Sequence, residues 1–241
     1  MKYNFLFLFL LVGFAACNIN SPDTAPTLVS QSTFDNDLQQ WTGEYAGYPL
    51  SKEANYKFKL GYGNFTTDAG KTYNAAIQTA YIDSGEVFTY VKNHIGGLKP
   101  NTNYDVVVRV QVYIQLLQDY NGSDLGEADK GCFLKAGVFT NEPKNDTITD
   151  ASVPGGKSIE TNFDIGHANN DGADAVFMNK ISLVRVGGSP LVYQSMNQDV
   201  PIPVKSDGDG YIWGIVGLQT NLKLYFQSYY HLIEFTFIES Q

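Results

Sequence analysis

Residues 97–115, GLKPNTNYDVVVRVQVYIQ, carry the pattern that most limits how this chain folds. A turn at Pro100, Asn101 and Thr102 precedes a strict two-residue alternation. Successive side chains of a β-strand point to opposite faces, so this alternation predicts one long strand. The face expected to be buried holds Tyr104, Val106, Val108, Val110, Val112 and Ile114. The opposite face is polar and aromatic, which predicts that water reaches it. It holds Asp105, Val107, Arg109, Gln111, Tyr113 and Gln115.

Other short segments have the same alternating or continuously apolar character, with Gly, Asn, Asp and Pro clusters between them. They are residues 54–60, 86–95, 133–139, 181–186, 211–218, 221–227 and 231–238. Beyond the first residues, no segment sustains a helical apolar period. The sequence therefore predicts an all-β fold, a β-sandwich or barrel of antiparallel strands, in one domain over residues 28–241.

Charge limits the partners that this chain can bind. The net charge is −9, and only Arg109 and Arg185 are arginines. Nucleic-acid binding needs a basic stripe, so we expect no nucleic-acid partner. An anionic membrane would repel so acidic a surface, so membrane contact is expected through a lipid anchor only.

The start of the chain, FLFLFLLVGFAACNIN at residues 5–20, has the layout of a secretory signal. Lys2 precedes an apolar run too short to span a bilayer, and small residues follow it. The ending FAAC resembles the lipobox of bacterial lipoproteins, although Phe14 stands where Leu is usual. That resemblance implies a signal peptide over residues 1–16, a lipidated Cys17 and a flexible tether over residues 17–27. It also implies a bacterial outer membrane location, with the periplasmic or cell-surface side left open.

The second cysteine, Cys132, has no intramolecular partner once Cys17 is modified. It begins the apolar segment CFLKAGVF, and no nucleophile signature surrounds it. We therefore expect a buried structural thiol.

Three segments together resemble carbohydrate-binding-module-like, galactose-binding-like jelly rolls. They are TFDNDLQQW (33–41), GLKPNTNYDVVVRVQV (97–112) and HLIEFTFIE (231–239). The body is also similar to uncharacterised lipoproteins of Bacteroidetes-type bacteria. The resemblance implies a jelly-roll sandwich with Trp41 in its core. It also implies a structural calcium near the first and last strands, where Asp35 and Glu234 match. No other cofactor is expected.

Two surfaces are candidates for ligand binding. Arg109, Gln111, Tyr113 and Gln115 combine an aromatic ring with hydrogen-bonding groups, as a sugar-binding sheet face requires. The alternative is a solvated face, or one covered by a loop with Arg109 paired to an acid. The aromatic loop WTGEYAGYPL (41–50) offers Tyr45 and Tyr48, unless it folds back over the sandwich.

The remaining polar segments are more typical of turns than of catalytic or metal-binding sites. DIGHANNDGADA (164–175) is expected to form an Asx-rich turn, and SDGDG (206–210) a hairpin turn. No nucleophile, zinc or phosphate motif is present, so no catalytic residue is expected and the chain is predicted not to be an enzyme. Two functions remain. One is a lipid-anchored glycan-binding protein, and the other is a structural or protein–protein interaction module of the cell envelope.

Overall fold

The computed structural model describes residues 26–83, 85–117, 130–181, 183, 191–197 and 201–240. These residues form fifteen strands and one short 3-10 helix, η1 (Leu50–Tyr56). The strands are β1 (Thr27–Ser32), β2 (Thr42–Ala46), β3 (Tyr48–Pro49), β4 (Lys59–Thr66), β5 (Thr72–Ile82), β6 (Val87–Ile95), β7 (Asn103–Leu116), β8 (Cys132–Phe139), β9 (Asn145–Thr149), β10 (Lys157–Thr161), β11 (Ala175–Ile181), β12 (Leu191–Asn197), β13 (Ile202–Lys205), β14 (Ile212–Thr220) and β15 (Leu224–Glu239).

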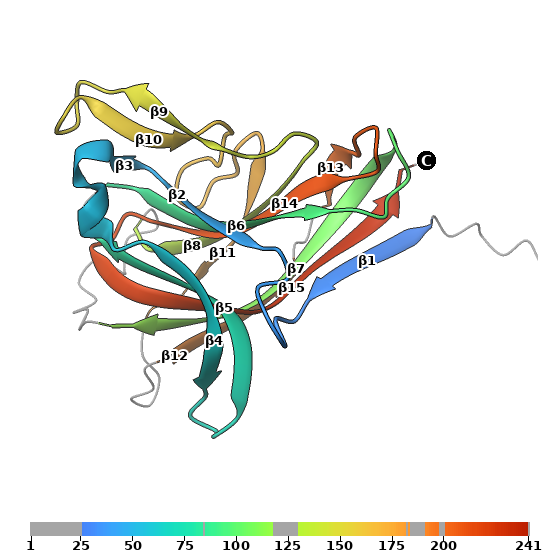
Figure 1. Ribbon diagram of the computed structural model, residues 1–241, viewed down its shortest axis with the longest axis horizontal. Helices are drawn as coiled ribbons and strands as arrows, with labels where there is room; N and C mark the ends of the chain where they lie inside the picture. The colour runs from blue at the N-terminus through green and yellow to red at the C-terminus, as the bar shows by residue number, and fades with distance from the viewer. Residues whose placement is uncertain are drawn as a thin grey trace, which may run out of the picture.

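The strands form two large antiparallel sheets that pack face to face as a β-sandwich (Figure 1). The seven-stranded sheet has the order β12-β7-β15-β5-β4, with β1 added to β15 and β13 added to β7. The five-stranded sheet has the order β11-β8-β14-β6-β2, and a small third sheet, β3-β10-β9, lies at one end. The predicted all-β, antiparallel β-sandwich is confirmed.

Consecutive long strands alternate between the two large sheets, which is the arrangement of a jelly roll. Strands β5 and β7 belong to the seven-stranded sheet, whereas β6 and β8 belong to the other. The last two strands then enter the middle of each sheet, with β14 between β6 and β8 and β15 between β5 and β7. Every central strand is therefore paired on both sides.

The core lies between the two sheets, where the long strand β7 contributes its predicted face. Tyr104, Val106, Val108, Val110, Val112 and Ile114 are all buried. The facing strands supply Val91, Leu134, Val216 and Leu218. Trp41 is also buried there, stacked on Phe235, and its indole N–H donates to Ser32 Oγ. Because such burial removes apolar surface from water, it is the main stabilising contribution to the sandwich.

Two predicted strands, 221–227 and 231–238, are one continuous strand, β15, which begins at Leu224. A β-bulge shifts its register between Tyr230 and Leu232. One extra residue there reverses which face the following side chains occupy. Apart from Tyr229, the buried residues of β15 accordingly fall on even numbers up to Tyr230 and on odd numbers from Ile233. The change of phase in the sequence is the mark of this bulge.

Three other local predictions differ from the structure or lie partly outside the described residues. The expected strand 54–60 is wrong in its first half, since η1 runs to Tyr56 and left-handed Lys57 separates it from β4. The segment 206–210 is a turn, but it joins β13 to β14 in different sheets, so it is not a hairpin. Most of the expected strand 181–186 lies outside the described residues, as do residues 1–16 and Cys17.

Within the described ranges, no helix has the length and apolar character that crossing a membrane would require.

Candidate functional site

The second face of β7 is half-buried, as its polar and aromatic side chains predicted. The register sets Tyr113 between Tyr193 of β12 and Tyr229 of β15. The Tyr113 and Tyr193 rings lie with centroids 4.5 Å apart, and Tyr193 remains 46% exposed. We call this surface the tyrosine face. It consists of Arg109, Gln111, Tyr113 and Gln115 of β7, together with Phe65, Tyr73, Tyr193 and Tyr229.

Curvature of the seven-stranded sheet brings β4 over this face. The Phe65 ring lies 4.6 Å from the Tyr113 ring and 4.9 Å from the Tyr229 ring, centroid to centroid. Tyr73 of β5 adds to the cluster, at 5.7 Å from Phe65. The aromatic rings therefore form a wall at one side of the face, beside the polar residues of β7.

Polar side chains continue the face beyond the aromatic wall. The Tyr229 hydroxyl lies 2.6 Å from Gln115 Oε1 and 2.7 Å from Gln227 Oε1, and its single hydrogen serves one of them at a time. This contact holds one amide side chain at a time, either Gln115 of β7 or Gln227 of β15. Gln111 and Arg109 follow along β7 at intervals of two residues, or about 7 Å.

Arg109 carries the positive charge of the tyrosine face. Glu234 stands directly opposite it on β15, but the Glu234 carboxylate accepts a hydrogen bond from Gln31 Nε2 at 2.7 Å. Within the described part of the chain, Arg109 forms no ion pair within 4.0 Å. Its guanidinium donors therefore remain available at the end of the row.

Burial affects the chemistry of Tyr113. Desolvation raises the pKa of its hydroxyl to about 12, and neighbouring Tyr73 and Tyr193 act in the same direction. The hydroxyl is therefore neutral at physiological pH and can both donate and accept a hydrogen bond. It cannot act as a base there.

The aromatic loop folds back onto the molecule instead of standing out from it. Tyr45 stacks on Phe58 at 4.0 Å, and the buried Tyr48 donates from its hydroxyl to Glu53 Oε1. Both tyrosines line a pocket of about 380 Å³ with Glu44 and Glu53. The loop therefore presents a recess, and a role of Tyr45 and Tyr48 in binding stays a prediction.

The predicted calcium ligands lie at the start of the sandwich. Asp35 follows β1, and its carboxylate accepts from Thr33 Oγ1 at 2.5 Å, while its carbonyl accepts from Tyr62 and Asn74. Glu234 is held by Gln31. Among the residues with described positions, no three His, Cys, Asp or Glu side chains gather closely enough to hold a metal ion. A calcium ion at Asp35 and Glu234 stays a prediction.

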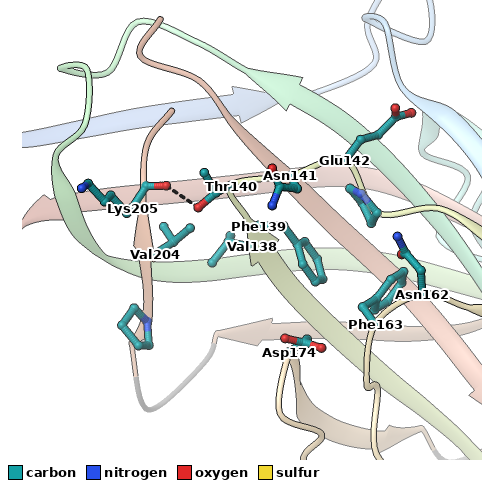
Figure 2. Close-up of a pocket in the computed structure, with 12 residues that line it drawn as sticks. Val138, Phe139, Thr140, Asn141, Glu142, Asn162, Phe163, Asp174, Val204 and Lys205 are labelled. Carbon is teal, nitrogen blue, oxygen red and sulfur yellow. Dashed lines mark hydrogen bonds between the residues drawn. The ribbon is translucent and has the colours of Figure 1, made fainter. Parts of the chain in front are cut away.

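A separate pocket of about 490 Å³ lies where the end of β8, of the five-stranded sheet, meets β13, of the seven-stranded sheet (Figure 2). The rings of Phe139 and Phe163 pack edge to face there, with centroids 4.9 Å apart. Asn141, Asn162 and Asp174 are among the polar residues around them. No pattern in the sequence marks this pocket, because its lining residues come from four separate segments.

The expected turn over residues 164–175 is confirmed and covers the outer face of the five-stranded sheet. The Asp164 carboxylate accepts from the backbone N–H groups of Gly166 and Ala173. The buried Lys135 Nζ donates to the carbonyl oxygens of Ile165 and Asn170, at 2.5 and 2.8 Å. This segment, the 164–175 loop, is thus fastened from within the sheet.

A scan against protein-family models finds no match, and a search of the curated proteins finds no relative. Several solved structures are similar to this chain. A mannan-recognising carbohydrate-binding module has 10% identity and a TM-score of 0.41, over 90% of this chain and 100% of that one. The cleaved adhesin domain K1 of Lys-gingipain from Porphyromonas gingivalis has 11% identity and a TM-score of 0.39, over 89% and 99%.

A third structure is an enzyme, a Stig cyclase from Fischerella. It has 10% identity and a TM-score of 0.38, over 89% of this chain and 90% of that one. With identities this low and TM-scores below 0.5, these similarities carry no argument about this chain. They assign no ligand or activity to this chain, since one fold serves many functions.

Proposed function

We propose that this protein is a non-catalytic glycan-binding protein, lipid-anchored at the bacterial outer membrane, and that the tyrosine face is its binding surface. The observation that carries the proposal is the exposed Tyr193 beside the half-buried Tyr113, in line with the hydrogen-bonding side chains of β7.

A sugar chain presents two kinds of surface, and the tyrosine face offers a partner for each. The C–H side of a pyranose ring is apolar and packs against aromatic rings, here Tyr193 with Tyr113 behind it. The hydroxyl groups need donors and acceptors, which Gln111, Gln115 and Arg109 supply. The row from Gln115 to Arg109 covers six residue-to-residue steps along one strand, or about 20 Å, which is long enough for several sugar units.

Cys132 and the three histidines are engaged in other contacts, which supports a non-catalytic role. Cys132 is buried, and burial raises the pKa of its thiol to about 12. His94 stacks between Tyr211 and Trp213, and His167 contacts the Glu86 carboxylate. His231 packs on Tyr73.

Lipid anchoring rests on the sequence around Cys17 and on charge. A net charge of −9 gives the protein no electrostatic attraction to an anionic membrane surface. Acyl chains on Cys17 would supply the missing affinity, since each buried methylene contributes about 0.8 kcal/mol. The tether before β1 would then hold the sandwich clear of the bilayer.

Affinity gel electrophoresis against a panel of soluble polysaccharides tests the proposed function. Retardation by at least one polysaccharide, reversed by the same free oligosaccharide, is the expected result. A protein that migrates unchanged through every polysaccharide gel would refute glycan binding. The alternative function, a structural or protein–protein interaction module of the cell envelope, would then be tested by a pull-down of partner proteins from membranes.

A further inference from the structure

The pocket in Figure 2 lies where the end of β8, in the five-stranded sheet, meets β13, which pairs with β7 in the seven-stranded sheet. None of its lining residues belongs to the tyrosine face. Its lining comes from the end of β8 and the residues after it, from β13, and from the two ends of the 164–175 loop region. A volume of about 490 Å³ falls within the range of small-ligand sites.

One wall of the pocket is apolar. Phe139 and Phe163 meet at an interplanar angle of 62°, and Val138, Pro203 and Val204 extend the apolar surface. Phe163 is nearly buried and is also packed against Tyr90. The wall is therefore fixed by the packing beneath it and needs no rearrangement to receive a ligand.

Two polar groups at the pocket are held in place by one of their atoms. Asn162 Oδ1 accepts from the Lys144 backbone N–H at 2.9 Å, which leaves its Nδ2 group as a donor. Asp174 Oδ2 accepts from the Asp164 N–H at 2.8 Å, and its other oxygen forms no hydrogen bond to a described residue. Asn141 is exposed and adds both a donor and an acceptor.

The charged side chains around the pocket indicate what charge its ligand should carry. Figure 2 shows the two phenyl rings between Asn141 and Asp174, with the Lys205 amine pointing away from them. The Glu142 carboxylate is paired with Lys92 and Lys144, at 3.1 Å in each case. The charge nearest the rings is then the Asp174 carboxylate, which repels an acidic sugar and accepts from a hydroxyl.

We propose that this pocket is a second carbohydrate site, which takes a single neutral sugar unit against Phe139 and Phe163. The two amides and the Asp174 carboxylate bind its hydroxyl groups. The ligand class rests on the proposed function, but the site is separate from the tyrosine face. Two separate sites would let one molecule bridge two glycan segments and gain avidity.

Two-dimensional NMR titration of the folded full chain with neutral monosaccharides, namely glucose, galactose, mannose and xylose, tests this site. The expected result is saturable shifts of the Asn141 and Asn162 side-chain amides for at least one sugar. Glucuronic and galacturonic acids should bind the pocket at least about fivefold more weakly, a factor worth roughly 1 kcal/mol. Asp174→Asn should remove that difference, and it keeps an acceptor for the Asp164 N–H.

Asn141→Ala and Phe139→Ala should each weaken the pocket shifts, whereas Tyr193→Ala should leave them unchanged. A spectrum unchanged outside the pocket shows that each variant is folded. Absence of saturable shifts at Asn141 and Asn162 with every sugar would overturn the proposal, as would pocket shifts that persist unchanged in both variants. If polysaccharides still retard the protein in gels when the pocket gives either of these results, only the second site is refuted. Glycan binding at the tyrosine face then still stands.

Discussion

The rings of Phe65 and Tyr113 lie with centroids 4.6 Å apart, although β5 and β15 separate their strands within the sheet. Three strand spacings in a flat sheet would separate them by about 14 Å. The sheet therefore curls, and small residues on this face, Gly63 and its partner Ala75, leave room for Phe65 to reach inward. This contact shapes the aromatic wall of the tyrosine face.

Removal of the Phe65 ring should therefore loosen the curl as well as the packing. We expect Phe65→Ala to lower the free energy of unfolding by about 3 kcal/mol, at the lower end of the range for a buried Phe. Urea denaturation measures the loss. Phe65→Leu serves as the control and should lose less than half as much. An Ala variant within about 1 kcal/mol of the unmodified protein would show that the contact does not hold the curl.

Cys132 should be inert in the folded protein. Its side chain is buried, and burial raises the pKa of the thiol to about 12, so almost no thiolate exists at pH 8. In a Cys17→Ser chain, a thiol reagent at pH 8 should label Cys132 only after urea unfolds the protein. Rapid labelling of the folded chain would contradict its placement at the start of β8.

The lowered pKa of the Lys135 amine predicts an unusual dependence of folding stability on pH. Desolvation lowers its pKa to about 8, although Glu86, Asp171 and Asp164 oppose the shift. An unfolded lysine has a pKa near 10.4. Between these values the folded state has released a proton that the unfolded state keeps, so stability rises with pH.

Lys135→Met isolates this contribution, because it removes the titrating group and keeps an unbranched side chain. The stability of the unmodified protein, relative to the Met variant, should increase from pH 8 to pH 9.5 in urea titrations. The Met variant should also exchange amide hydrogens of the 164–175 loop faster, since two carbonyl oxygens lose their donor. Parallel pH profiles for the two proteins would contradict the lowered pKa.

Cys17 should determine where the protein is found. We expect Cys17→Ala to move the protein from the membrane fraction to the soluble fraction, because the acidic sandwich has no other attraction to lipid. Immunoblots of fractionated cells measure the distribution. Cys132→Ala is the matched control and should stay with the membranes. An anchor elsewhere in the chain would be required if the Cys17 variant also stayed there.

The sequence predicted both faces of β7 residue by residue. In a half-buried strand, buried and exposed side chains alternate, and apolar and polar residues alternate with them. The sequence did not predict that Tyr193 and Tyr229 flank Tyr113. That arrangement depends on strand order, and the three residues are far apart in the chain. The helix η1 was also missed, since its apolar residues fall on alternate positions as they would in a strand.

Trp41 shows what sequence patterns can and cannot distinguish in this chain. Its burial was expected, yet nothing in the loop around it indicated that Tyr45 and Tyr48 would line a recess. The pocket at Phe139 and Phe163 was likewise not predicted from the sequence, because loop residues have no periodicity from which their spatial neighbours can be inferred.

Titration of a retarding glycan into single variants of the tyrosine face tests the central claim most directly. Isothermal calorimetry with Tyr193→Ala, Gln111→Ala and Arg109→Ala should show affinity falling at least about tenfold for Tyr193→Ala, a loss of about 1.4 kcal/mol. Tyr211→Ala is the control, since Tyr211 is a similarly exposed tyrosine outside the tyrosine face, just before β14, and it should bind as the unmodified protein does. Equal affinities for all three face variants and the control would contradict glycan binding at this face.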